Sequence, residues 1–177
     1  MGVKTKIRKP WGFKKKPKRT PIITRDQWGA TEPLWRDTLQ VPVFNVLIKY
    51  YTDSPPCDNE EECSDNLRIL QRKCQDELRL PDIPYNFVIG GDERVYEGRG
   101  WFTAPSKMFG EVAHWEDTSL DIAYLGHRMP GKHMTPALGE LLEYGIDKKV
   151  IVGLFKFEVL SGWDEPPPQI KFLETQF

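Results

Sequence analysis

The chain has 177 residues, 39% of them hydrophobic and 12% aromatic, which is enough for one compact domain with its own core. No apolar run approaches the roughly 20 residues that a membrane-spanning helix needs, and residues 1–19 lack the apolar stretch of a secretory signal. The net charge of −1 conceals an asymmetry, because residues 20–177 are acidic and therefore a poor partner for nucleic acid.

The first 19 residues form a basic arm that holds nine Lys and Arg residues and no acidic residue. Residues 20–177 hold 16 basic and 26 acidic residues, and we interpret them as the folded domain. Such an arm is typical of a solvated tail or a juxtamembrane segment, and its charge also suits phosphates or lipid headgroups. The sequence leaves these roles of the arm open.

In chain order, residues 20–29 predict a short strand and a turn, and residues 43–52 (VFNVLIKYYT) predict a strand inside a sheet. Residues 64–78 predict a helix that begins at Ser64 or Asp65, either of which can cap it. Its apolar face is formed by Leu67, Leu70, Cys74 and Leu78. Since small thiols pack well, Cys74 is expected to be buried on this face.

The second half of the chain continues this alternation of strands and helices. Residues 85–97 predict a hairpin that turns at residues 90–92 (GGD), and residues 120–125 (LDIAYL) predict a further strand. The segment between them, residues 102–118, has no periodicity and predicts a long loop.

A second helix is expected to begin at Thr135 and Pro136 and to end at Gly145 as its C-cap. Residues 155–160 predict the final strand, and residues 169–177 predict a last helix. The alternation predicts an α/β fold with a central mixed β-sheet.

The chain has three cysteines, an odd number. Five residues separate Cys57 from Cys63, in a proline- and acid-rich stretch that is not expected to be helical throughout, which allows a small-loop disulfide. Such a bridge would indicate an oxidising compartment.

Four motifs occur in a recognisable order: DQWGA at residues 26–30, Cys-x5-Cys, DIPYNFVIGGDERVYEGRGW at residues 82–101, and SLDI at residues 119–122. Together they resemble the peptidoglycan-recognition protein family over about residues 20–176. The resemblance implies the fold of a phage-type N-acetylmuramoyl-L-alanine amidase, with a central mixed sheet, about three helices and a groove for glycan and stem peptide.

Catalytic members of that family use a zinc ion held by two His and one Cys, with a supporting Tyr. Here the resemblance places Tyr50 and Trp163 at the two His positions, and no cysteine follows Cys74. Only Tyr85, at the position of the supporting Tyr, remains. A neutral phenol and an indole are poor zinc ligands. The resemblance therefore implies no zinc, no other cofactor and no amidase activity.

The resemblance places these residues along the ligand groove or its remnant: Thr52, Tyr85, Arg99, Trp101, Tyr50, Tyr51, Arg79, Leu80, Lys107 and Trp163. Arg99 stands where a guanidinium grips the extra carboxylate of diaminopimelate, a task that suits bidentate hydrogen bonding. Arg79 and Leu80 replace the Gly-Trp pair of receptors for that peptide. Tyr50 and Trp163 are bulkier than His, so we expect them to fill volume that the sugar needs.

The segment between Trp101 and Ser119 is a few residues longer than its family counterpart and places Met108 and Phe109 near the groove rim. An exposed Met-Phe pair is more suited to a protein than to a sugar. We therefore treat Met108 and Phe109 as a candidate partner surface.

The sequence as a whole predicts a non-catalytic, insect receptor-type domain of innate immunity with a degraded groove. Its expected role is to dampen peptidoglycan-triggered signalling by pairing with another receptor ectodomain of the family, with peptidoglycan binding weak or absent. Its expected place is outside the cell, anchored to the plasma membrane by a segment outside this chain. One alternative is a sensor that still binds diaminopimelate-type peptidoglycan through Arg99, and another assigns the activity to the basic arm.

Overall fold

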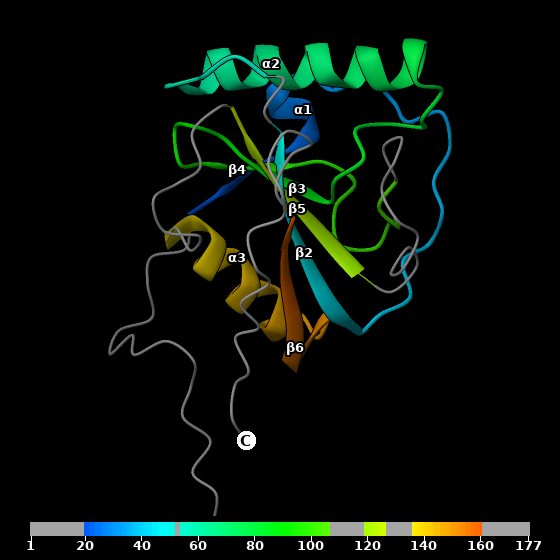
Figure 1. Cartoon of the computed structure of the whole chain (residues 1–177), viewed down its shortest axis with the longest axis vertical. Coiled ribbons are helices and arrows are strands. Elements are labelled where there is room, and N and C mark those ends of the chain that lie inside the picture. Colours follow the sequence, from blue (N-terminus) through cyan, green and yellow to red (C-terminus); the bar gives the residue numbers. More distant parts are fainter. Residues whose placement is uncertain (1–19, 52–53, 107–118, 127–135, 161–177) are drawn as a thin grey trace, which may run out of the picture.

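The structure, a computed structural model, describes residues 20–51, 54–106, 119–126 and 136–160 (Figure 1). The basic arm, the long loop beyond residue 106 and the expected last helix at residues 169–177 lie outside these residues. None of the described helices is long and apolar enough to cross a membrane.

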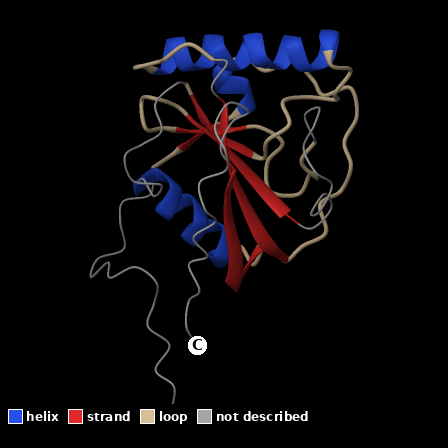
Figure 2. Cartoon of the chain, in the orientation of Figure 1, coloured by secondary structure: helices blue, strands red, loops and turns tan. Residues whose placement is uncertain are grey.

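The centre of the described fold is one sheet of six strands in the order β1-β4-β3-β5-β2-β6 (Figure 2). The strands are β1 (Ile22–Ile23), β2 (Val43–Tyr51), β3 (Phe87–Ile89), β4 (Val95–Glu97), β5 (Ser119–Leu125) and β6 (Ile151–Leu160). β3 and β4 form the predicted antiparallel hairpin, and the other neighbours in the sheet are parallel. The predicted mixed sheet is therefore confirmed.

Helices cover both faces of this sheet (Figure 1). They are α1 (Arg25–Trp28), α2 (Glu60–Arg72), which continues into the π-helical segment η1 (Lys73–Glu77), and α3 (Pro136–Asp147). Along β3 the side chains alternate, so that Phe87 and Ile89 join the core cluster under α3 while Val88 joins the cluster under α2. The molecule thus has two cores separated by the sheet.

The start of α2 differs from the prediction, because the helix begins at Glu60 rather than near Ser64. Asn59 is the N-cap and accepts a hydrogen bond from the backbone N–H of Glu62. Three glutamates fill the first turn, where negative charge is favourable next to the unpaired N–H groups. The acidic stretch that was interpreted as loop therefore forms the first helical turn, and Cys63 lies within it.

The N-terminal turn and the end of α3 also differ from the prediction. Residues 25–28 form the single helical turn α1, which Thr24 caps and Gly29 ends with a φ of 75°. Gly145 is not a C-cap, since α3 continues through Asp147. The final strand begins at Ile151, four residues earlier than predicted.

The three cysteines take the arrangement that the sequence allowed. Cys57 and Cys63 form a disulfide, whereas Cys74 is free and buried. The disulfide packs against the β3–β4 turn, where a Cβ on Gly91 would lie 2.2 Å from the Cys57 carbonyl oxygen. The close approach explains why glycine occupies this position of the turn.

Candidate ligand groove

The segment after β4, residues 98–101, folds back onto Tyr85 and Asn86, the two residues that precede β3. The backbone N–H of Arg99 donates to the Tyr85 carbonyl at 2.9 Å, and those of Gly98 and Gly100 donate to the Asn86 carbonyl at 2.9 and 3.0 Å. A Cβ on Gly98 would lie 2.3 Å from the Tyr85 carbonyl oxygen, and Gly100 has a φ of 71°, so both positions favour glycine. This backbone network holds Arg99 next to Tyr85.

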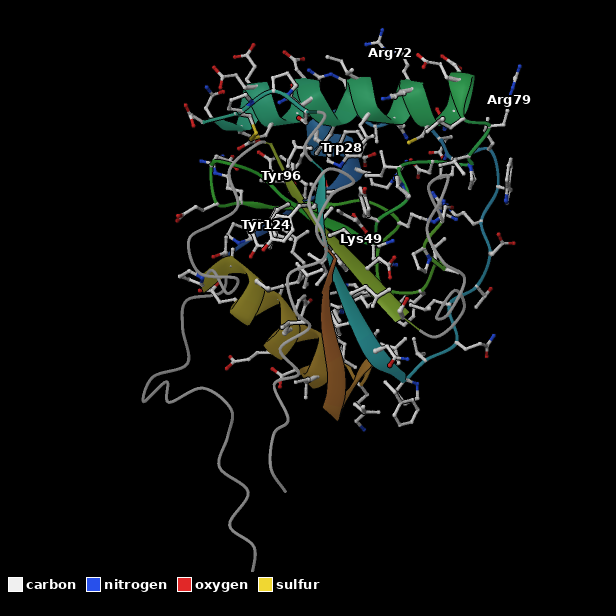
Figure 3. All side chains as sticks on the ribbon, in the orientation of Figure 1. Trp28, Lys49, Arg72, Arg79, Tyr96 and Tyr124 are labelled. Carbon is white, nitrogen blue, oxygen red and sulfur yellow. A yellow bond between two sulfur atoms is a disulfide. The ribbon has the colours of Figure 1, made fainter. Side chains whose placement is uncertain are left out.

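Beneath Tyr85 lies a buried polar cluster formed by Lys49, Asn86, Ser119 and Asp121. The Lys49 Nζ lies 2.7 Å from the Asp121 Oδ2 and 5.7 Å from the centre of the Tyr85 ring. The Ser119 hydroxyl lies 2.7 Å from the Asp121 Oδ1, and the Asp121 backbone N–H donates to the Asn86 Oδ1 at 2.9 Å. This polar cluster connects β2, β5 and Asn86, the residue before β3. Figure 3 shows Lys49 near the middle of the molecule.

Sequence reasoning missed this polar cluster, although the signal was present. Lys49 and Asp121 are single charges inside otherwise apolar strands, and such charges are rarely buried unless they are paired. In the sheet they stand on neighbouring strands, with Asp121 beside Leu47 and Lys49 beside Ala123. Two lone opposite charges in two predicted central strands therefore indicate an ion pair.

The guanidinium of Arg99 is buried, with only 7% of the residue exposed. Its Nε donates to the Ala104 carbonyl at 2.5 Å. Burial lowers the pKa of Arg99, while the carboxylates of Asp82 and Asp37 oppose that shift. The Arg99 side chain is thus held by the protein itself rather than extended into solvent.

Arg99 lines a cavity of about 200 Å³ together with Arg25, Arg36 and Asp82. The Asp82 Oδ2 lies 2.7 Å from the Arg25 Nη1, and the Asp82 Oδ1 accepts from the Gln71 side chain and the Ile83 backbone at 2.8 Å each. The cavity is therefore cationic but partly neutralised. It is smaller than the roughly 300–1,000 Å³ of most small-molecule sites.

Tyr50 lies on the opposite side of the sheet from Tyr85. It belongs to the core under α3 and its ring stacks on that of Tyr124, with 5.5 Å between ring centres, whereas Tyr85 belongs to the core under α2. Burial, with a smaller contribution from Tyr124, raises the pKa of Tyr50 to about 12, which keeps its phenol neutral. A buried neutral phenol does not fit a zinc ion. Among the described residues, no three His, Cys, Asp or Glu side chains lie together as a metal site would require.

The remaining candidate residues are dispersed. Trp101 packs in the core under α3, 4.4 Å from the ring centre of Phe87. Arg79 is exposed beyond the end of η1 with a φ of 57° (Figure 3), and Leu80 is half-buried against the core under α2. The structure therefore joins Tyr85 and Arg99 by a backbone hydrogen bond and sets Tyr50 on the other side of the sheet from Tyr85. Trp101 belongs to the core under α3 and also lines the cavity beside Arg99.

Six sequence-based candidates fall outside what the structure describes. They are Thr52, Lys107, Met108, Phe109 and Trp163, together with the side chain of Tyr51. Their assignments stay predictions.

A larger cavity of about 440 Å³ lies on the α3 side of the sheet and does not include Arg99 in its lining. Its lining includes Ile22 of β1, Trp101, and Glu140 and Tyr144 of α3. The backbone N–H of Thr20 donates to a Glu140 carboxylate oxygen at 2.6 Å at this site. Sequence reasoning gave no indication of this cavity, because it depends on how β1 packs against α3.

Comparison with curated proteins finds clear relatives, although no family model matches the chain. The chain is 37% identical over 129 residues to peptidoglycan-recognition protein 1 of Holotrichia diomphalia, a match that covers 71% of this chain and 63% of the relative. It is 31% identical over 138 residues to peptidoglycan-recognition protein 2 of the same species, covering 76% of this chain and 71% of the relative. The chain thus spans slightly less than two thirds of the first relative.

Comparison with solved structures gives the same result. Wild-type PGRP-LB of Drosophila is similar with a TM-score of 0.71 and 28% identity, over 78% of this chain and 81% of that chain. The ectodomain complex of PGRP-LCa and PGRP-LCx with bound tracheal cytotoxin is similar with a TM-score of 0.70 and 28% identity, over 78% and 82%. These neighbours confirm the fold that the sequence predicted.

Proposed function

This chain belongs to the peptidoglycan-recognition protein family, and on that premise we propose that it is a non-catalytic, receptor-type domain of innate immunity. In this proposal the domain dampens peptidoglycan-triggered signalling by pairing with another receptor ectodomain of the family. The observation that carries the proposal is the burial of Tyr50, at the first zinc position, against Tyr124 in the core under α3.

The loss of catalysis is supported by the chemistry of the available side chains. Tyr50 offers a neutral phenol where the family mechanism needs an imidazole, and no cysteine follows Cys74 to act as the thiolate ligand. The test is incubation with peptidoglycan in the presence of zinc, with an active family amidase as the positive control. We expect no release of stem peptide, and zinc-dependent release would contradict the proposal.

Weak peptidoglycan binding is supported by the state of Arg99. Its guanidinium is buried, its Nε is bound to the Ala104 carbonyl, and the adjoining cavity holds only about 200 Å³. A muropeptide carboxylate that binds the Arg99 guanidinium must compete with these contacts, and that cost lowers the affinity.

Pairing with another ectodomain is supported by the relatives. In the similar structure, tracheal cytotoxin is bound to a complex of two ectodomains, PGRP-LCa and PGRP-LCx, so ectodomains of this fold can pair. An extracellular position on a membrane-anchored receptor agrees with that comparison and with the Cys57–Cys63 disulfide.

The pairing is tested by sedimentation velocity with a fluorescently labelled PGRP-LCx ectodomain, so that self-association of this chain does not enter the signal. We expect the labelled ectodomain to sediment faster when this chain and tracheal cytotoxin are present. The double substitution of Met108 and Phe109 by Ser should remove the shift. A control substitution of the exposed Ile69 on α2 by Ser should keep it. The absence of a complex both with and without cytotoxin would contradict the pairing.

A second candidate function is a sensor of diaminopimelate-type peptidoglycan. It is favoured by the three guanidinium groups of Arg25, Arg36 and Arg99 around one cavity, which suit the extra carboxylate. Arg99→Ala distinguishes the two candidate functions. If the domain is a sensor, the variant no longer binds diaminopimelate-type peptidoglycan. If the domain acts by pairing, the variant still pairs with the other ectodomain.

A further inference from the structure

Three exposed apolar side chains lie on the two segments that border the Arg99 cavity. Among the residues that the structure describes, six large apolar residues are exposed, and three of these are Leu34, Trp35 and Phe102. Arg36 and Phe102 line the cavity itself, and Leu34 and Trp35 directly precede Arg36 in the chain. Leu34, Trp35, Arg36 and Phe102 are called the rim patch below.

Backbone hydrogen bonds hold both segments of the rim patch in place. The Leu39 N–H donates to the Phe102 carbonyl at 2.9 Å, which sets the two segments side by side. The Leu34 N–H donates to the Pro81 carbonyl at 2.8 Å, which fixes the first segment to the connection after η1. The backbone of the rim patch is therefore ordered before any partner arrives, and binding loses less conformational entropy.

The side chains of the rim patch suit a protein partner. Aromatic residues and arginine are enriched at protein interfaces, and Trp and Arg in particular carry much of the binding energy there. A group of exposed apolar side chains next to polar ones is typical of such a contact surface. The cavity of about 200 Å³ is small, so a partner makes most of its contacts with the rim patch outside it.

The charges around the cavity favour a partner that carries a carboxylate. Three guanidinium groups and two carboxylates line the cavity, which leaves one positive charge in excess. These groups belong to Arg25, Arg36, Arg99, Asp82 and Glu97. The Arg36 side chain is 56% exposed, and its contact with the exposed Glu32 at 3.5 Å contributes little to stability. A carboxylate of the partner can therefore replace Glu32 at Arg36.

On the basis of the pairing function proposed above, we propose that the rim patch is the surface that contacts the other ectodomain. Trp35 and Phe102 pack against apolar side chains of the partner, and Arg36 pairs with one of its carboxylates. Arg99, with 7% of the residue exposed, lies behind this surface and makes no contact with the partner.

The contact is tested by sedimentation velocity, with the labelled PGRP-LCx ectodomain and tracheal cytotoxin titrated with the whole 177-residue chain. Trp35→Ser and Phe102→Ser should each raise the dissociation constant about tenfold or more. Phe44→Ser is the matched control, because Phe44 at the start of β2 is 62% exposed and Phe102 is 59% exposed. Its dissociation constant should stay within about twofold of the wild-type value. Arg36→Glu should also weaken the complex, whereas Arg72→Glu on the exposed face of α2 should not.

Hydroxyl-radical footprinting of the wild-type chain gives a second measurement that needs no variant. Oxidation of Trp35 and Phe102 should fall several-fold when the ectodomain is bound, and oxidation of Phe44 should not change. A wild-type chain that forms no complex would contradict the pairing function and the rim patch together. A complex that forms equally well with Trp35→Ser and Phe102→Ser, or that leaves Trp35 and Phe102 unprotected, would overturn the rim patch alone. If a variant does not fold, the footprint of the wild type decides.

Discussion

The ion pair of Lys49 and Asp121 carries two charges into the interior of the sheet, with side-chain exposures of 7% and 4%. Taking charges out of water is unfavourable, and the pair is tolerated because the Ser119 hydroxyl also bonds the Asp121 carboxylate. The Asn86 Oδ1 accepts from the Asp121 backbone N–H and so fixes the position of that residue. Removal of one partner leaves the other charge buried without compensation. The ion pair is therefore expected to matter for stability more than any surface pair.

We predict that Lys49→Met lowers the free energy of unfolding by about 3–5 kcal/mol, because Asp121 then stays buried without its partner. The double variant Lys49→Met with Asp121→Leu should recover most of this loss. The control is Glu60→Gln, which breaks the exposed pair of Glu60 with Arg94 and should change stability by less than about 1 kcal/mol. Urea denaturation measures all three variants, and a loss in Lys49→Met no larger than that in Glu60→Gln would contradict the prediction.

Tyr50 gives a prediction about high pH. Its native pKa of about 12 lies above the value near 10 of an unfolded tyrosine, so the folded protein keeps a proton that the unfolded chain loses. The stability that the neutral Tyr50 phenol contributes is complete below about pH 10 and is lost as the pH rises through about 12. We predict that the free energy of unfolding falls less in Tyr50→Phe than in the wild type between pH 9 and pH 12. The difference between the two falls should reach about 2 kcal/mol. Urea midpoints across this range measure the difference, and parallel pH profiles would contradict the assignment.

At the scale of elements, α3 contains two glycines in different surroundings. A Cβ at Gly139 would meet nothing within 4 Å, whereas a Cβ at Gly145 would lie 2.5 Å from the Ile151 Cδ1 and 2.8 Å from the Trp101 Cζ3. Gly145 is therefore explained by the close approach of α3 to β6 and Trp101. Gly139 has no comparable contact.

We predict opposite effects for alanine at these two positions of one helix. Gly139→Ala should stabilise the protein by about 1 kcal/mol, because alanine is the better helix former. Gly145→Ala should destabilise it by about 1–3 kcal/mol through overpacking. Thermal unfolding measures both, and effects of the same sign would show that the packing of α3 is described incorrectly.

The elements that could be predicted from the sequence are those with strong local signals. β2 and β5 are apolar strands, and the hairpin of β3 and β4 is marked by its Gly-Gly-Asp turn. The start of α2 was missed because three glutamates were interpreted as loop although they favour the first turn of a helix. The end of α3 was missed because a glycine required by tertiary packing has the same local signal as a C-cap.

At the scale of the whole molecule, the strand order could not be predicted from the sequence. β5 lies between β3 and β2, and β6 pairs with β2, so these contacts join segments that are far apart in the chain. The same limit applies to the candidate groove. The resemblance places Arg99 and Tyr85 along one groove, but their backbone contact and the direction of Tyr50 depend on the fold. Strand register turns Tyr50 into the core under α3.

The central claim, that the groove no longer works as a peptidoglycan site, is tested most directly by calorimetric titration. The whole chain is titrated with a monomeric diaminopimelate-type muropeptide, and an intact receptor of the family serves as the positive control. The account predicts no heat of binding under conditions in which the control gives a clear isotherm. Measurable heat would contradict it, and the loss of that heat in Arg99→Ala would identify the domain as a sensor.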